Sequence, residues 1–114
     1  MAYEALDFYD IDSLLTDEER MIRDVVRDWV DDRILPNIED ACREGVFPDE
    51  WRAEIGEMGI LGAPLKGYGC PGLSYTAYGV ICRELERGDS GVRSFASVQG
   101  SLVMYPIWDF GSEE

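Results

Sequence analysis

Arg93 is the only charged side chain between Ser90 and Trp108, in a stretch of apolar and small polar residues. The whole chain has a formal net charge of −14, so this arginine is not needed for solubility. We expect the segment to be mostly buried, and an unpaired buried charge is costly, so the guanidinium requires an anion. Because the planar fork of arginine can hold a carboxylate through two hydrogen bonds, Arg93 suggests carboxylate recognition.

Small hydroxyl side chains accompany Arg93 at helical spacing. If a helix is capped by Asp89 or Ser90, its first turn contains Arg93 and Ser94, where free backbone N–H groups favour anions. The same face continues at i+4, i+8 and i+11 from Arg93 with Ser97, Ser101 and Met104. This pattern predicts a slot with a carboxylate receptor at one end.

A second interpretation of Arg93 also remains open at this stage. Glu86 precedes the turn that brings the chain back toward Arg93, so the two could form an ion pair that only ties two helices together. Glu84 and Glu86 lie beside Arg83 and Arg87. We expect both glutamates to form surface ion pairs, each worth less than about 1 kcal/mol, rather than an acid and base pair.

The elements that position these residues are all predicted to be helical. Thr16 and Glu19 form a capping-box pattern, and apolar residues then recur at helical spacing. The predicted helices cover residues 16–35, 37–44, 48–58, 74–87 and 89–104, with a last short turn from Pro106 to Gly111. No segment alternates with period two, so the fold class is all-α, a bundle of five or six helices with mostly antiparallel neighbours. Residues 111–114 are expected to open a further helix that is cut off.

Two segments match known binding motifs in part, but neither is predicted to form a binding site. Residues 67–72 have the spacing G-x-G-x-x-G, but the preceding run contains Gly62 and Pro64, so a loop between helices is preferred to a dinucleotide-binding turn. Asp10 and Asp12 suggest the start of a calcium loop. Leu15 and Met21 stand where that loop needs Gly and Glu, and no metal site is predicted.

Composition narrows the classes of function. The 114 residues make one small domain, and their acidic balance argues against a nucleic-acid partner or an anionic membrane surface. The nine arginines and single lysine, Lys66, with this acid excess indicate either a protein of a high-salt cytoplasm or a piece of a less acidic protein. The chain has no histidine, which excludes Ser–His and Cys–His nucleophile pairs and histidine-ligated metals.

The sequence also indicates the cellular compartment in which the protein is expected. Three cysteines without a CxxC motif indicate free thiols in a reducing environment: Cys42, Cys70 and Cys82. No stretch is long and apolar enough to span a bilayer. Residues 1–12 are acidic and resemble neither a mitochondrial transit peptide nor a signal peptide. We therefore expect a cytoplasmic protein, or one of the mitochondrial matrix if the source is eukaryotic.

Several segments resemble the acyl-CoA dehydrogenase family, and specifically its glutaryl-CoA branch. They lie at residues 7–16 with 19–20, at 61–72, at 84–107 and at 110–114. The resemblance covers essentially all 114 residues and implies that residues 1–114 form the N-terminal α-helical domain, with the middle β-domain and the C-terminal bundle absent.

The resemblance implies an FAD-dependent oxidoreductase that assembles as a homotetramer. Such an enzyme oxidises an acyl-CoA thioester: a glutamate removes the α-proton while a hydride passes to the flavin. The glutaryl-CoA branch also decarboxylates its product to crotonyl-CoA and CO2 and passes electrons to an electron-transfer flavoprotein. The catalytic glutamate and most FAD contacts belong to the absent parts, so no catalytic residue is expected here and the isolated chain should be inactive.

The resemblance also assigns roles to the residues around Arg93. Arg93 and Ser94 match positions that receive the terminal carboxylate of glutaryl-CoA, and Glu86 matches an acid that orients the arginine. Ser97 belongs to the slot argued from spacing. Other interpretations are a non-decarboxylating or other acyl-CoA dehydrogenase, or a free-standing acidic helical module that docks onto a partner.

Overall fold

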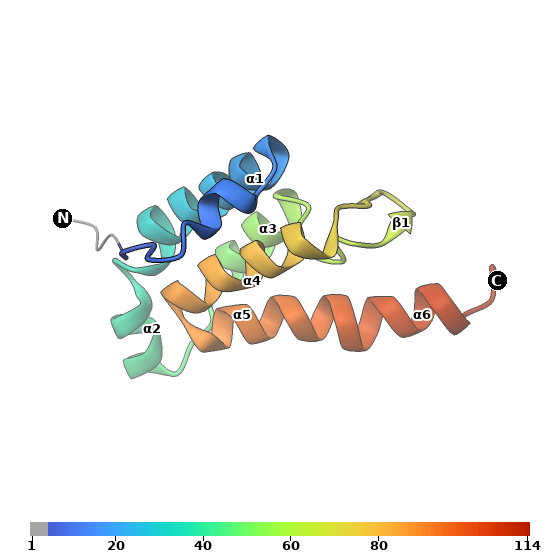
Figure 1. Cartoon of the computed structure of the whole chain (residues 1–114). Helices are drawn as coiled ribbons and strands as arrows, with labels where there is room; N and C mark the ends of the chain where they lie inside the picture. The colour runs from blue at the N-terminus through green and yellow to red at the C-terminus, as the bar shows by residue number, and fades with distance from the viewer. Residues whose placement is uncertain (1–4) are drawn as a thin grey trace.

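Helices dominate the computed structural model, which describes residues 5–114 (Figure 1). The α-helices are α1 (Asp17–Trp29), α2 (Ile38–Glu44), α3 (Asp49–Glu57), α4 (Tyr75–Gly88), α5 (Ser90–Ser97) and α6 (Tyr105–Phe110). A 3₁₀ helix covers Ile11–Leu14, and two π-helical segments, η2 and η3, cover Val30–Ile34 and Val98–Met104. The prediction of an all-α fold with five or six helices is confirmed.

The predicted capping box of α1 is present and connects α1 to α4. The Thr16 hydroxyl accepts from the Glu19 N–H at 3.2 Å, and the Glu19 carboxylate accepts from the Thr16 N–H at 2.9 Å. The second oxygen of Glu19 accepts a hydrogen bond from Ser74, whose hydroxyl caps α4 by accepting from the Ala77 N–H. The starts of α1 and α4 therefore lie together, and the two helices run parallel.

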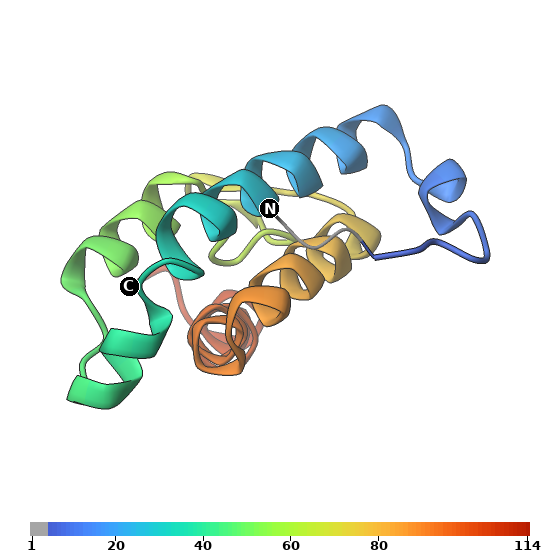
Figure 2. The same cartoon turned by 90° about the vertical axis from the view of Figure 1, so that its left-hand side faces the viewer.

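The core lies where α1, η2, α4 and α5 meet, with α3 packed alongside (Figure 2). Its most buried side chains come from distant segments of sequence: Val26, Val30, Ile34, Ile55, Ile81, Leu85 and Val92. The connection from α4 to α5 is a single residue, Asp89, whose side chain accepts from the Val92 N–H at 3.0 Å. This tight turn makes α5 antiparallel to α4.

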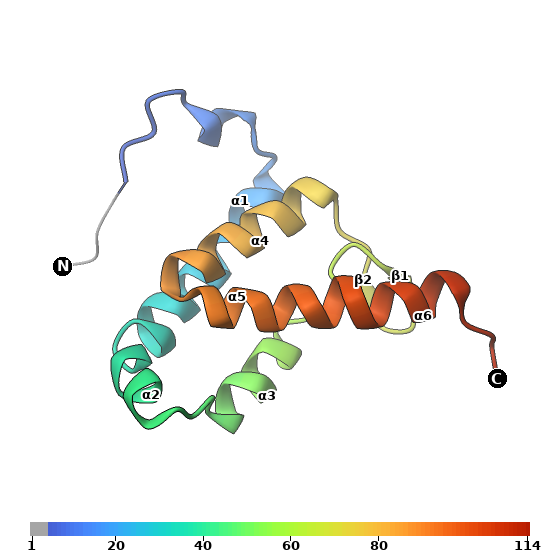
Figure 3. The ribbon, with the colours of Figure 1, turned by 90° about the horizontal axis from the view of Figure 1, so that it is seen from below.

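The C-terminal part of the chain differs from expectation in two ways. α5, η3 and α6 form one continuous helical rod from Ser90 to Phe110, without the predicted boundary at Pro106 (Figure 3). The wider π turns just before Pro106 accommodate its ring and missing N–H, which would break a regular α-helix. The expected burial is also wrong beyond Gly100, because Leu102, Ile107 and most of their neighbours are exposed.

The glycine-rich loop closes as a tight hairpin between β1 (Lys66–Gly67) and β2 (Cys70–Pro71). Gly67 and Gly69 have φ of 83° and 80°, a conformation that side chains disfavour. The predicted loop between helices is thus observed, with a small two-stranded ladder added. Nearby, Gly100 in η3 approaches the backbone so closely that a β-carbon there would lie 3.2 Å from the Gly62 nitrogen.

None of the helices among residues 5–114 is long and apolar enough to cross a membrane. Within the same residues, no group of three or more histidine, cysteine, aspartate or glutamate side chains is arranged to hold a metal ion. Residues 1–4 of the acidic N-terminal stretch lie outside the described part of the chain.

Candidate functional site

Two stripes of polar side chains face each other across α4 and the α5–η3 rod. Each has members at i, i+4 and i+8: Tyr78, Cys82 and Glu86 on α4, and Arg93, Ser97 and Ser101 on the rod. We call these six residues the polar seam. Because the helices are antiparallel, Glu86 meets Arg93 at one end of the seam, and Tyr78 meets Ser101 at the other.

Arg93 is held in place by two side chains of the polar seam. Its Nε donates to the Glu86 carboxylate at 2.7 Å, and its Nη1 donates to the Ser97 hydroxyl at 3.1 Å. About a third of the Arg93 side chain, 35%, is exposed. The guanidinium is therefore oriented but open to solvent, and Nη2 has no hydrogen-bond partner among the described residues. The ion pair with Glu86 exists and still leaves donors available.

Glu86 is fixed as a carboxylate acceptor for Arg93. Its second oxygen accepts a hydrogen bond from the Ser90 hydroxyl, one turn along the chain. The hydrogen bond from Arg93, followed by that from Ser90, lowers the pKa of Glu86, so the group is ionised at neutral pH. Glu86 can thus orient Arg93 without acting as an acid or base.

Ser94 is the predicted site residue that the structure does not join to the others. Its side chain is half-buried and makes no hydrogen bond within residues 5–114, although its backbone carbonyl accepts from the Ser97 hydroxyl at 3.2 Å. The structure therefore brings Arg93, Glu86 and Ser97 together, and leaves Ser94 beside them in sequence with an unused hydroxyl.

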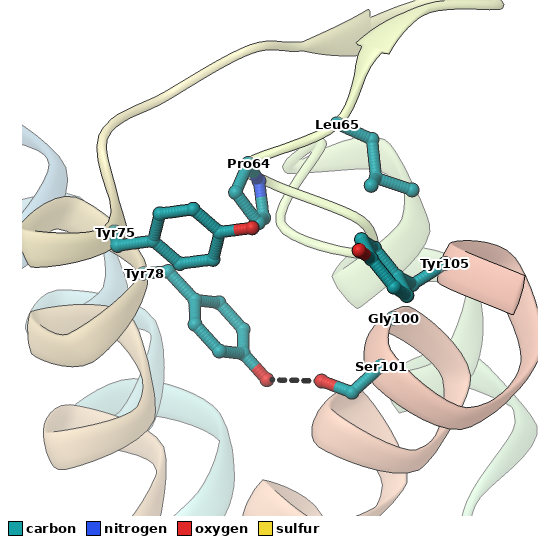
Figure 4. Close-up of a pocket in the computed structure, with 7 residues that line it drawn as sticks. All are labelled: Pro64, Leu65, Tyr75, Tyr78, Gly100, Ser101 and Tyr105. Carbon is teal, nitrogen blue, oxygen red and sulfur yellow. Dashed lines mark hydrogen bonds between the residues drawn. The ribbon is translucent and has the colours of Figure 1, made fainter. Parts of the chain in front are cut away.

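A cavity of about 210 Å³ opens at the other end of the polar seam (Figure 4). It is lined by Pro64, Leu65, Tyr75, Tyr78, Gly100, Ser101 and Tyr105. At its edge the Tyr78 hydroxyl and the Ser101 hydroxyl are hydrogen-bonded at 3.1 Å. No motif in the sequence indicated this cavity, although Tyr78 lies eight residues before Glu86 and its spacing could have placed it on the same face.

Cys82 occupies the middle of the polar seam. Burial raises the pKa of its thiol, while the neighbouring Tyr78 and Arg93 act in the opposite direction. The thiol is therefore neutral at physiological pH and serves as a small lining group between the two ends of the seam.

Glu84 contradicts the prediction of a surface ion pair. Its side chain is 1% exposed and accepts from Arg27 at 3.0 and 3.1 Å, from Arg87 at 3.0 Å and from Arg83 at 3.2 Å. The prediction failed because the arginine that holds Glu84 on both oxygens comes from α1, which sequence neighbours do not reveal. This cluster lies on the face of α4 toward α1 and ties the two helices together.

Neither the cavity nor the G-x-G-x-x-G run has the geometry of a complete FAD site. The cavity is smaller than the roughly 300 Å³ at which pockets for drug-sized ligands begin. The G-x-G-x-x-G run forms a hairpin instead of a turn from a strand into a helix, so it lacks the geometry that binds a dinucleotide.

Comparison with known proteins finds a matching family, similar sequences and similar solved structures. Residues 16–114 match the family description "Acyl-CoA dehydrogenase, N-terminal domain". A probable acyl-CoA dehydrogenase of Bacillus subtilis, YngJ, is 33% identical over 103 residues, which cover 88% of this chain and 27% of that protein. The mitochondrial short-chain specific acyl-CoA dehydrogenase of Rattus norvegicus is 30% identical over 101 residues, which cover 88% of this chain and 24% of that protein.

Two solved structures of glutaryl-CoA dehydrogenase from Mycobacterium smegmatis are more similar. One, in complex with FADH2, is 49% identical with a TM-score of 0.91, and the match covers 95% of this chain and 28% of the other chain. The other is 55% identical with a TM-score of 0.86, and the match covers 90% of this chain and 27% of the other chain. The chain thus spans about a quarter of the length of these relatives.

Proposed function

This chain belongs to the acyl-CoA dehydrogenase family, and from that premise we propose that it is the N-terminal domain of an FAD-dependent glutaryl-CoA dehydrogenase. Its part in that enzyme is to form one wall of the substrate site and to select a thioester with a terminal carboxylate. The similarity to the two Mycobacterium smegmatis structures supports the choice of branch within the family.

The observation that carries this proposal is the state of Arg93. The guanidinium is oriented by Glu86 and Ser97 and retains donors that no other described residue uses, and the Arg93 side chain is 35% exposed. An arginine has five N–H donors, and a carboxylate can occupy two of them side by side. A guanidinium prepared in this way binds a carboxylate with little loss of side-chain freedom.

Glutaryl-CoA fits this receptor because its acyl chain ends in a second carboxylate. The thioester end would lie toward the cavity side of the polar seam and the free carboxylate at Arg93. The unused hydroxyl of Ser94 lies in the first turn of α5 and would donate to the same carboxylate. Glu86 keeps its hydrogen bond to Nε of Arg93 and acts as a positioning residue.

The chemistry itself is assigned to other parts of the enzyme. By resemblance to the family, the catalytic base, the residues that govern decarboxylation and most contacts to the flavin would belong to a middle β-domain and a C-terminal helical bundle. A homotetramer and an electron-transfer flavoprotein as electron acceptor complete the proposal. A non-decarboxylating relative would use the same Arg93 receptor and differ only in those other domains.

The proposal is tested by substituting Arg93→Gln in the complete flavoenzyme and comparing two thioesters of equal chain length. Glutaryl-CoA ends in a carboxylate and pentanoyl-CoA ends in a methyl group. Loss of a charge-assisted pair should lower kcat/KM for glutaryl-CoA about 50-fold and change that for pentanoyl-CoA by less than about threefold. Equal losses on both substrates would contradict the role of Arg93 as a carboxylate receptor.

A further inference from the structure

Two arginine–glutamate pairs that join helices elsewhere in the structure use both carboxylate oxygens. Arg27 of α1 donates from Nε and Nη2 to the two oxygens of Glu84, on α4, at 3.1 and 3.0 Å. Arg33 of η2 donates from the same two nitrogens to the two oxygens of Glu54, on α3. Such pairs are frequently bound through two parallel hydrogen bonds, which add energy and fix the geometry. Each of these glutamates therefore occupies both Nε and Nη2 of its arginine.

The pair between Glu86 and Arg93 differs from these two. Nε of Arg93 donates to Oε2 of Glu86 at 2.7 Å, but Nη2 has no hydrogen-bond partner within residues 5–114. The other oxygen of Glu86, Oε1, accepts from the Ser90 hydroxyl instead. This hydrogen bond turns Oε1 toward the start of α5, so Glu86 holds Arg93 through one oxygen only.

Ser90 is the first residue of α5 and follows directly on the turn at Asp89. Two hydrogen bonds fix that turn: the Asp89 side chain accepts from the Val92 N–H at 3.0 Å, and the Asp89 carbonyl accepts from the Arg93 N–H at 3.1 Å. Ser90 and Arg93 are three residues apart in one helical turn and therefore reach Glu86 from the same side. The Ser90 side chain is exposed, and among residues 5–114 its hydroxyl bonds to Glu86 alone, so its contribution is to orient Glu86.

We propose that Ser90 is a positioning residue of the carboxylate receptor: it holds the second oxygen of Glu86 and thereby keeps Nη2 of Arg93 available to the substrate. The inference rests on the proposed function, in which Arg93 receives the terminal carboxylate of glutaryl-CoA. Without the Ser90 hydroxyl, Glu86 is free to pair with Nε and Nη2 together, as Glu84 and Glu54 do with their arginines. Glu86 would then use a donor of Nη2 and bring its second negative oxygen beside the substrate carboxylate, and the two like charges would repel each other.

The experiment measures KM and kcat of the complete Ser90→Ala enzyme for glutaryl-CoA and pentanoyl-CoA. We expect kcat/KM for glutaryl-CoA to fall about fivefold through a rise in KM, with kcat within about twofold, because binding of the carboxylate is weakened alike before and during the reaction. The value for pentanoyl-CoA should stay within about twofold, because its methyl end makes no ion pair. Ser90→Thr keeps a hydroxyl and should retain the native preference. Ser13→Ala is the matched control, since it removes another exposed serine hydroxyl, which donates to the Asp10 carbonyl at 2.7 Å.

A crystal structure of the Ser90→Ala enzyme provides a second readout, in which Glu86 should accept from both Nε and Nη2 of Arg93. Glu86 remaining on Nε alone, equal losses on the two thioesters, or a loss in Ser90→Thr as large as in Ser90→Ala would overturn the inference. The Arg93→Gln enzyme separates this inference from the proposed function. If Arg93→Gln leaves the preference for glutaryl-CoA unchanged, the receptor role itself fails; if Arg93→Gln lowers that preference and Ser90→Ala does not, only the role of Ser90 fails.

Discussion

Glu84 and Glu86 are two residues apart on α4 and face opposite sides of the helix. Glu84 is buried toward α1 and accepts from arginines on both oxygens. Glu86 is 47% exposed and meets a single arginine, Arg93, with Ser90 on its other oxygen. On the Glu84 side of α4, several arginines surround one carboxylate. On the Glu86 side, a single carboxylate holds a single arginine.

The difference shows how to separate a structural ion pair from one that can bind a ligand. Around Glu84 both carboxylate oxygens are occupied, the carboxylate is inaccessible, and the cluster joins α1 to α4. At Arg93 the guanidinium is fixed by Glu86 and Ser97 but remains accessible, next to a seam that leads to a cavity. A buried carboxylate indicates an ion pair that stabilises the fold, whereas a fixed and accessible arginine indicates one that can bind a ligand.

The largest expected effect concerns stability on the Glu84 side. Glu84→Gln removes the carboxylate that Arg27, Arg83 and Arg87 share, and within the described residues only Arg87 of these three arginines keeps an ion pair, with Asp31 at 2.8 Å. Removing one partner of a buried pair costs up to about 5 kcal/mol, and partial exposure of the arginines reduces this, so we expect the unfolding free energy to fall by about 2–4 kcal/mol. Chemical denaturation measures the change.

Glu86→Gln is the matched control for Glu84→Gln. Its ion pair is exposed, so its loss should change the unfolding free energy by less than about 0.5 kcal/mol. Equal destabilisation by the two substitutions would contradict the distinction between the two faces of α4.

Two glycines of α4 extend the comparison to packing. A β-carbon at Gly88 would lie 2.8 Å from Val30 and 3.1 Å from Ile34, both fully buried, whereas one at Gly79 meets nothing within 4 Å. Gly88→Ala should therefore destabilise the chain by about 1–2 kcal/mol through overpacking. Gly79→Ala should stabilise it by about 0.5–1 kcal/mol through helix propensity. Thermal unfolding of both variants tests this, and stabilisation by Gly88→Ala would show that the contact between η2 and α4 is loose.

A smaller effect is expected in the pH dependence of stability. Burial on its own raises the pKa of Glu84, but hydrogen bonds from Arg27 and Arg87 outweigh it and lower the pKa below the usual value. A group with a lowered pKa in the folded state stabilises the fold above the unfolded pKa, about 4.3 for glutamate, and this stabilisation is lost as the pH falls through the folded pKa. The native chain and Glu84→Gln should therefore converge in stability below about pH 4.

Unfolding measured between pH 3 and pH 7 on both chains tests the sign of this effect. A constant difference over the whole range would mean that the charge of Glu84 contributes nothing. The Glu86→Gln chain serves again as control, because the pKa of Glu86 is lowered by the exposed Arg93 and its effect on stability should be small throughout.

Local signals in the sequence predicted much of the fold and part of the site. The capping box at Thr16, the glycine that ends α2 and the periodicity of α4 depend on residues close in sequence, and all appear in the structure. The spacing from Arg93 to Ser97, and the turn after Glu86, also placed these three side chains together.

Features that depend on distant segments were not predictable. Arg27 reaches Glu84 from α1, 57 residues away, so the burial of Glu84 could not be read from its neighbours Arg83 and Arg87. The continuity of the rod through Pro106 depends on π turns, which no local signal in the sequence indicated. The cavity at Tyr78 exists only because η3 packs against the loop after α3.

The most direct test compares two arginines, each bound to a glutamate of α4. In the complete enzyme, Arg93→Gln and Arg27→Gln are each measured for the ratio of kcat/KM between glutaryl-CoA and pentanoyl-CoA. We predict that Arg93→Gln lowers this ratio about 50-fold, as expected for a lost charge-assisted pair, and that Arg27→Gln leaves it within about twofold while destabilising the fold. An unchanged ratio in Arg93→Gln, or an equal fall in both variants, would contradict the assignment of substrate selection to the Glu86 side.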